Sequence, residues 1–341
     1  MHCTTRLAFV ILCALGATGC PSGSDSGNTH NTPFPLQRPL ASDPAPHLGP
    51  DIYVAFLEDA LTSALAEELA GLEAQEVALA YETADDDSLE HLASIPTLRG
   101  LSLASCHGLS GDCLEHVAEL AQLELLDLTD LPWLRDDHLS QLRGLHQLTT
   151  LSILVNPQLT GTGIEHLGAL PALSTLEMEP MPADGAAALG QLSLVRSLKI
   201  HESANMGRPD IDDANLVEIG KLDSLEELEL HSVGFLLASR RGLVALGGLT
   251  QLRTLVLTET EDMTSDDLRT LAGLTSLRDL HLLCLNMNAG YTTEDLVDLV
   301  EQLRSLRTLK ISYYTGGGGL AARLRALRPD LRVEVSEDLI D

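Results

Sequence analysis

The chain has 341 residues, of which 44% are hydrophobic, so it is long enough to bury a sizeable core. Aromatic residues make up only 3% of it, and the core must therefore be aliphatic. With 21 lysines and arginines against 50 aspartates and glutamates, the formal net charge is −29 at pH 7. Such a surface repels nucleic-acid phosphates and anionic headgroups. We therefore expect no nucleic-acid partner, and a basic partner fits the charge better.

The first twenty residues have the pattern of an export signal. Arg6 precedes the apolar run Leu7–Leu15, small residues follow, and Cys20 comes next. The run is too short for a bilayer of about 30 Å. The stretch Ala17–Cys20 resembles the lipobox of bacterial lipoproteins, in which the cysteine is acylated and becomes the new N-terminus. We expect a signal peptide over residues 1–20 and lipidation of Cys20, with ordinary secretion and cleavage elsewhere as the alternative.

Lipidation of Cys20 predicts that the protein is attached to the membrane through the lipid alone. The protein would then belong to the bacterial cell envelope, anchored on the periplasmic side of the outer membrane or at the cell surface. Residues 21–50 are rich in Pro, Ser, Gly and Asn and show no apolar period, which is typical of a linker.

The folded domain is predicted to span residues 51–341. Its first segment places leucines three or four residues apart, which indicates an amphipathic helix that ends near Gly71; these are Leu57, Leu61, Leu65, Leu69 and Leu72. A short strand should follow around Val77 and Leu79. Residues 51–80 would thus form an N-terminal helical cap. Apolar residues after a four-glycine run predict a C-terminal cap over residues 316–341.

Between the caps, a leucine pattern repeats with a period close to 25 residues. If Leu98 is position 1, apolar side chains fall at positions 4, 6, 9, 12, 17, 20 and 23, and the unit from Leu123 fills the same places. Later units vary in length, but position 4 is always leucine: Leu101, Leu126, Leu151, Leu176, Leu198, Leu228, Leu255, Leu280 and Leu309. A repeat of this kind predicts a solenoid.

The spacing inside a unit predicts its shape. Positions 4 and 6 alternate with polar residues, as in a short strand with one face inward, and positions 17, 20 and 23 have helical spacing. Neighbouring strands lie about 4.8 Å apart, whereas helices need about 8–10 Å. The stack must therefore curve into a horseshoe of the α/β class, with parallel strands on the concave face and helices on the convex face.

The sequence LxxLxL followed by a helical leucine pattern resembles the leucine-rich-repeat family, and its 25-residue unit is similar to the cysteine-containing subtype. The resemblance covers about residues 74–335 and implies the solenoid fold while leaving the function open. Position 9, often Asn or Cys in that family, is mostly apolar here. Cys106 occupies it in the first unit and is expected in the core; a bridge between Cys106 and Cys113 is left open.

No catalytic or cofactor motif is found: HExxH, GxSxG, GxGxxG, the P-loop and the EF-hand loop are all missing from the sequence. We therefore expect no enzyme and no cofactor. One polar group is of interest on the predicted concave face. Strand spacing should place one carboxylate and two imidazoles in one row and two carboxylates beside Lys199 in the next; the candidate ligand-binding residues are Glu177, Glu179, His201, Glu202, Glu229 and His231.

Three readings of this group stay open: a hydrated acidic face, part of a protein footprint, or a divalent-metal site. A second candidate is the edge formed by the loops that follow the strands, where long units carry extra residues. Residue types common at interfaces occur there: Met206, Arg208, Phe235, Leu236, Met287 and Tyr291.

The sequence thus favours a non-enzymatic module that binds a protein partner. A structural spacer of the envelope is the main alternative, and a metal-binding surface protein is a further one. The oligomeric state is not indicated.

Overall fold

The structure is a computed structural model of the 341-residue chain. It describes residues 10–12, 53–57, 61–79, 84–201, 211–231, 240–258, 263–283, 290–312 and 319–336. One sheet runs through all of these parts, and its 13 strands follow each other in chain order. β1 (Val10–Leu12) pairs antiparallel with β2 (Tyr53–Leu57), and every later pair is parallel.

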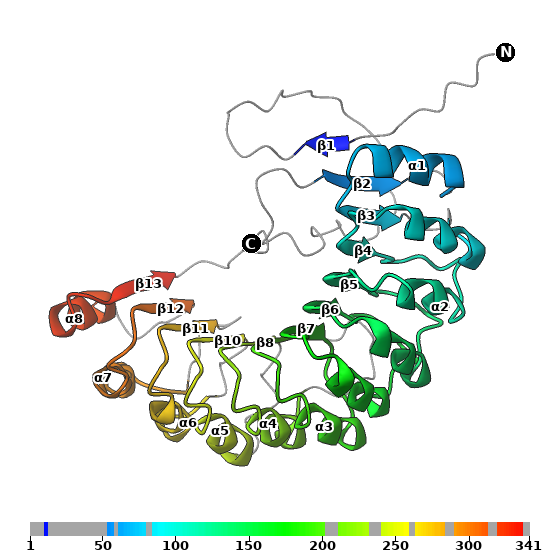
Figure 1. The fold of residues 1–341 in the computed structure, drawn as a ribbon. Helices are drawn as coiled ribbons and strands as arrows, with labels where there is room; N and C mark the ends of the chain where they lie inside the picture. Colours follow the sequence, from blue (N-terminus) through cyan, green and yellow to red (C-terminus); the bar gives the residue numbers. More distant parts are fainter. Residues whose placement is uncertain are drawn as a thin grey trace, which may run out of the picture.

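The strands line the inside of a curved solenoid and the helices cover its outside, as Figure 1 shows. After β2 the strands are β3 (Glu76–Leu79), β4 (Gly100–Ser102), β5 (Leu125–Asp127), β6 (Thr150–Ser152), β7 (Thr175–Met178), β8 (Ser197–Ile200), β9 (Glu227–Leu230), β10 (Thr254–Thr258), β11 (Asp279–Leu283), β12 (Thr308–Ser312) and β13 (Arg332–Ser336). The predicted α/β horseshoe, with parallel strands inside and helices outside, is confirmed.

The helical layer of the described residues contains both α-helices and 3₁₀-helices. The α-helices are α1 (Ser63–Gly71), α2 (Cys113–Ala118), α3 (Ala183–Leu189), α4 (Asp213–Ile219), α5 (Arg240–Leu246), α6 (Ser265–Thr270), α7 (Thr293–Gln302) and α8 (Leu320–Leu327). The 3₁₀-helices are η1 (Asp86–Ser94), η2 (Asp136–Gly144), η3 (Thr162–Ala169) and η6 (Leu271–Gly273). In η2 the buried leucines Leu139 and Leu142 are three residues apart, which matches the three residues per turn of a 3₁₀-helix.

The leucine columns form the core. Every leucine at position 4, from Leu101 to Leu309, has no exposed surface, and the leucines, isoleucines and methionine at position 6 lie beside them. The register explains this, because β4 pairs with β5 so that Leu101 lies opposite Leu126, and the same match continues along the sheet. One apolar column per position therefore runs through the whole stack.

The N-terminal cap differs from the prediction. Tyr53–Leu57 forms strand β2, so a helix from Leu57 onward was wrong in its first turns. The segment is rich in aromatic and β-branched residues, which favour strands. The helix begins only after Thr62, whose side chain accepts a hydrogen bond from the Leu65 amide, and it ends at Gly71 as predicted. The strand predicted around Val77 and Leu79 is β3.

The predicted signal peptide lies almost entirely outside the described residues, as does Cys20. Only β1 belongs to it, and the removal of this segment from the mature protein stays a prediction. Among the described residues, no helix is both long and apolar enough to cross a membrane.

Carboxylates at the starts of the helices join one unit to the next. The carboxylate of Asp136 accepts hydrogen bonds from the amides of Thr160, Gly161 and Gly163 and from the Thr160 hydroxyl, at 2.7–3.0 Å. Gly163 passes so close to Asp136 that a Cβ atom would lie 2.3 Å from the Asp136 carbonyl oxygen. Gly161 has a φ of 97°, which suits glycine.

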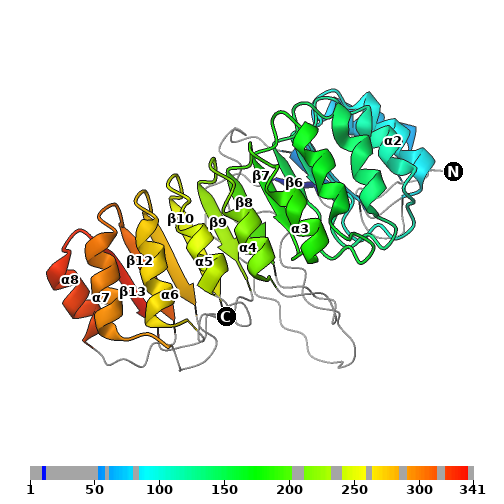
Figure 2. The same ribbon diagram turned by 90° about the horizontal axis from the view of Figure 1, so that it is seen from below.

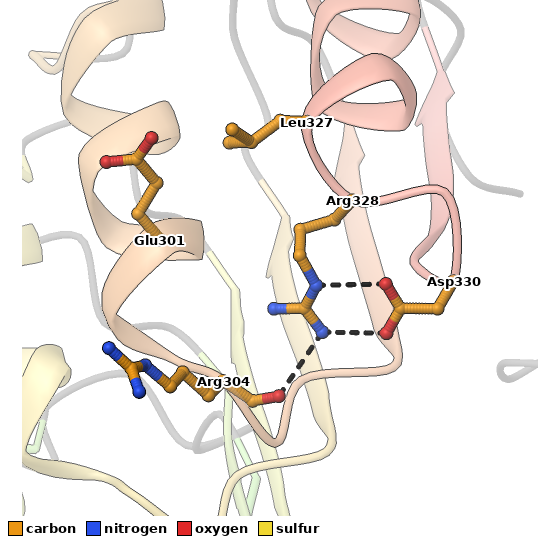
Figure 3. A pocket seen from close by; sticks show the side chains of 5 residues that line it. All are labelled: Glu301, Arg304, Leu327, Arg328 and Asp330. Carbon is orange, nitrogen blue, oxygen red and sulfur yellow. Dashed lines mark hydrogen bonds and ion pairs between the residues drawn. The ribbon is translucent and has the colours of Figure 1, made fainter.

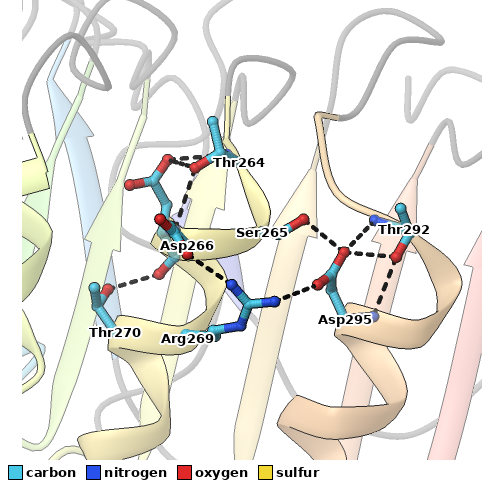
Figure 4. Close-up of polar contacts among 8 residues, drawn as sticks. Thr264, Ser265, Asp266, Arg269, Thr270, Thr292 and Asp295 are labelled. Atoms are coloured by element: carbon cyan, nitrogen blue, oxygen red, sulfur yellow. Dashed lines mark hydrogen bonds and ion pairs between the residues drawn. The ribbon is translucent and has the colours of Figure 1, made fainter.

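The C-terminal helices show the same linkage (Figure 4). Thr264 and Thr292 each form a capping box with an aspartate three residues on. Asp295 then reaches back to the preceding unit, where it accepts a hydrogen bond from Ser265 at 2.7 Å and contacts Arg269 at 3.3 Å. The caps therefore stabilise both their own helix and the contact between helices.

The cysteines of the first unit are free thiols. Cys106 and Cys113 are both buried and unbridged. Burial, with the charge of Asp127 nearby, raises the pKa of the Cys106 thiol to about 12, and burial likewise raises the pKa of Cys113. They are unreactive core residues at neutral pH, because only the thiolate is a nucleophile.

Candidate functional site

The first part of the candidate site is a row of charged side chains on the concave face. Sheet register places Lys199 between Glu177 on β7 and Glu229 on β9, as predicted. The Lys199 ammonium lies 3.5 Å from a Glu177 carboxylate oxygen and 3.7 Å from one of Glu229. All three side chains are largely screened from solvent, so these contacts are stronger than ordinary surface ion pairs.

The second part is a pair of stacked imidazoles. His201 and His231 directly follow β8 and β9, and their amides donate to the carbonyl oxygens of Met178 and Ile200 at 2.9 Å. Their ring centres are 4.9 Å apart and the ring planes are inclined by 9°. His231 also lies 3.7 Å from Glu229, which joins the two rows. The Nε2 atom of His201 is buried without a hydrogen-bond partner among the described residues.

Burial and the neighbouring charges set the protonation of the cluster. Burial lowers the pKa of His201 to about 4, and the adjacent His231 adds to this effect. Burial raises the pKa of Glu177 although Lys199 opposes it, whereas the His231 ring lowers that of Glu229. For Lys199 burial acts against the charge, but the two carboxylates prevail and raise its pKa. At neutral pH His201 is therefore uncharged.

Two further members of the predicted group are Glu179 and Glu202. Glu179 is only 1% exposed, and its predicted place in one row with His201 and His231 stays a prediction. It lies just beyond the end of β7, as His201 and His231 lie just beyond the ends of β8 and β9. Glu202 lies outside the described residues.

The structure also extends the row towards the N-terminus. Register continues it from Glu177 to Ser152 and Asp127, both 2% exposed. Asp127 accepts a hydrogen bond from the Ser102 hydroxyl at 2.9 Å. These residues occupy position 5 of earlier units, so the repeat frame could have identified them from the sequence.

We define the concave cluster as Asp127, Glu177, Lys199, His201, Glu229 and His231. Its carboxylates outnumber its one ammonium group by three to one. Among the described residues, no group of three His, Cys, Asp or Glu side chains is placed to hold a metal ion. The geometry gives a reason, because the Lys199 ammonium occupies the space between Glu177 and Glu229 that a cation would need.

The second predicted site, the loop edge, is mostly not addressed by the structure. Met206, Arg208, Phe235, Leu236 and Met287 lie outside the described residues. Tyr291 is described and is only 4% exposed, in contact with the core, so the expectation that it is an exposed contact was wrong.

A shallow hollow between α7 and α8 is lined by Glu301, Arg304, Leu327, Arg328 and Asp330 (Figure 3). The Arg328 guanidinium forms two hydrogen bonds with the Asp330 carboxylate, at 3.0 and 2.8 Å. It also donates to the carbonyl oxygens of Arg304 and Leu306, beyond the end of α7. Arg328 thus ties the C-terminal cap to the last full unit and is not free to bind a ligand.

Comparison with known proteins identifies the fold. No protein-family model and no curated protein matches the chain. Among solved structures, the chain is similar to TLR13, in a complex with ssRNA13, with 18% identity over 77% of this chain and 36% of TLR13, at a TM-score of 0.52. An internalin of Listeria monocytogenes matches with 20% identity over 81% of this chain and 71% of the internalin, at 0.49. A leucine-rich-repeat protein of Leptospira interrogans matches with 14% identity over 81% of both chains, at 0.37.

The chain spans about a third of TLR13. At these identities the likeness concerns the fold alone, and together with the repeat register it establishes a leucine-rich-repeat solenoid.

Proposed function

We propose that this chain is a non-enzymatic binding module of a bacterial cell envelope, anchored through a lipid on Cys20, whose concave cluster contacts a basic region of a protein partner. Solenoids of stacked repeats offer extended concave surfaces that suit macromolecular binding. Here the centre of that surface holds fixed charges of mainly negative sign.

The observation that carries the proposal is how firmly the side chains of the concave cluster are held in place. Lys199 and the carboxylates fix each other, and the imidazoles stack on one another with His231 beside Glu229, so the surface is preorganised. Preorganised groups lose little conformational entropy when a partner binds.

Site-specific photo-crosslinking in native envelopes tests the proposal. A photoreactive residue replaces His231 on the concave face or, as a matched control, His116 on the convex helix α2. We expect the probe at His231 to capture one discrete protein, and the probe at His116 to capture none of it. The yield should fall in a Glu229→Gln background and with rising salt, because the partner is basic.

Equal capture from both positions, or none from His231, would overturn the proposal. A passive spacer predicts that second outcome, together with full tolerance of Glu229→Gln. Capture that is insensitive to salt and to Glu229→Gln would refute a basic partner.

A further inference from the structure

A second charged surface lies on the edge where each helix turns into the next strand, at the other end of the strands from His201 and His231. Equivalent positions just before successive strands carry Arg196, Glu226, Arg253, Arg278 and Arg307. Their backbones are joined by hydrogen bonds of 2.7–2.8 Å from unit to unit, and Arg332 follows from Arg307 in the same way. Figure 2 shows these helix-to-strand turns as a continuous edge of the C-terminal units.

This edge is unusual for so acidic a chain. Of the 21 lysines and arginines, 16 lie after residue 195, and residues 51–195 contain only three. We call Arg253, Arg278 and Arg307 the arginine row. All three side chains are exposed, and strand spacing places their backbones about 4.8 Å apart.

The carboxylate of Glu226 shows how an acidic side chain is bound at this edge. Glu226 occupies the position between Arg196 and Arg253, and its two carboxylate oxygens lie 2.7 Å from one guanidinium and 2.6 Å from the other. One acidic side chain is thus held by arginines of both flanking units. Arginine suits this role because its planar guanidinium matches a carboxylate with two parallel hydrogen bonds.

The following units lack such a carboxylate. Within the described part of the chain, neither Arg278 nor Arg307 has an ion pair or a side-chain hydrogen bond, and the nearest acidic influence on Arg307 is the Asp330 carboxylate, whose pKa the Arg307 charge helps to lower. Arg304, in the turn before Arg307, is also exposed, and its guanidinium points away from Arg328 in Figure 3. Arg278, Arg304 and Arg307 are therefore exposed beside Arg253, whose guanidinium is already paired with Glu226.

We propose that the arginine row binds a short acidic segment of polypeptide, whose aspartate or glutamate side chains take the place that Glu226 takes in the preceding units. From Arg253 to Arg332 the edge spans about 14 Å, the length of about four or five extended residues. A long polyanion fits less well, because beyond the row it meets the strongly acidic N-terminal units. This surface is separate from the concave cluster and has the opposite charge preference.

Binding of a fluorescent hexaglutamate peptide to the purified domain, followed by anisotropy at low salt, tests the proposal. The variant Arg278→Gln/Arg307→Gln removes two charges from the row. The control Arg269→Gln/Arg323→Gln removes two from arginines on convex helices that are already paired with Asp266 and Glu294. We expect the first variant to weaken binding at least tenfold and the control to leave it within twofold, with unchanged circular dichroism for both.

Other results would overturn the proposal. One is the absence of peptide binding by the unmodified domain. Another is an equal loss of binding in both variants, which would indicate attraction by overall charge. Binding of inorganic polyphosphate or of phosphatidylglycerol vesicles as tight as that of hexaglutamate would also refute a site for acidic peptides. The concave-face crosslinking is independent of all these outcomes, since it depends on other residues and on a basic partner.

Discussion

Replacing Asp136 with alanine should destabilise the solenoid far more than its place near the surface suggests. The change removes four hydrogen bonds that the carboxylate accepts from Thr160, Gly161 and Gly163 of the next unit. A hydrogen bond to a charged group contributes about 1.5–3 kcal/mol when buried, and less where water competes. Because Asp136 is half-buried, about 1 kcal/mol per bond is reasonable. We expect a loss of about 3–5 kcal/mol in the free energy of unfolding.

Urea unfolding followed by circular dichroism measures this loss. Asp137→Ala is the matched control, because the neighbouring side chain is 80% exposed and its change should cost less than about 0.5 kcal/mol. Asp136→Asn keeps one acceptor oxygen and should fall between the two. If Asp136→Ala and Asp137→Ala differ by less than about 1 kcal/mol, the carboxylate does not link the units and the reasoning is refuted.

The pH dependence of the free energy of unfolding provides a second check on the role of Asp136. Burial opposes the charge on Asp136, but the hydrogen bonds from Gly163, Thr160 and Gly161 prevail and lower its pKa. A carboxyl group whose pKa is lowered by folding stabilises the native state above its ordinary pKa of about 4, and this contribution is lost as the pH falls through the folded pKa. The gap between the unmodified protein and Asp136→Asn should therefore narrow in acid.

Four further predictions concern a histidine, the repeat register, a core leucine and the N-terminal anchor. The pKa of His201 is about 4 when folded and about 6.5 when unfolded, so stability should fall by about 1–3 kcal/mol between pH 6.5 and 4, and His201→Gln should remove that slope in urea melts. An unchanged slope would contradict it. Excision of Leu123–Gln147 joins equivalent positions and should preserve cooperative melting by circular dichroism, whereas a deletion of twelve residues should not. Leu151→Ala should lower the free energy of unfolding by about 2–5 kcal/mol. Cys20→Ser should move the protein from the membrane to the soluble fraction, and retention would refute the lipid anchor.

The solenoid could be predicted because its signal is repeated in every unit. Leucines at position 4 are fully buried in each one, so the periodicity alone specifies strand, register and curvature. The sequence could not distinguish the 3₁₀-helices from α-helices, because a spacing of three residues fits both kinds of helix. The strand Tyr53–Leu57 was missed because its last leucine also starts a helical pattern.

The concave cluster was predictable only as far as strand alternation holds. Glu177, Lys199 and Glu229 lie within strands, and register alone makes them neighbours. Glu179, His201 and His231 each lie just past the end of a strand, where side-chain direction depends also on the turn. The stacking of His201 on His231 also depends on ring orientation, which spacing does not encode.

The order of the sheet has a mechanical consequence. Among the described residues, each strand from β2 to β13 pairs only with the strands before and after it in the chain, so no strand pairing joins the two ends of the solenoid. Under tension applied at its two ends, the molecule should yield one unit at a time. A released unit of 25 residues adds about 85 Å of extended chain. Such a molecule lengthens in steps while the remaining units keep their fold, as a row of separate extensible links would.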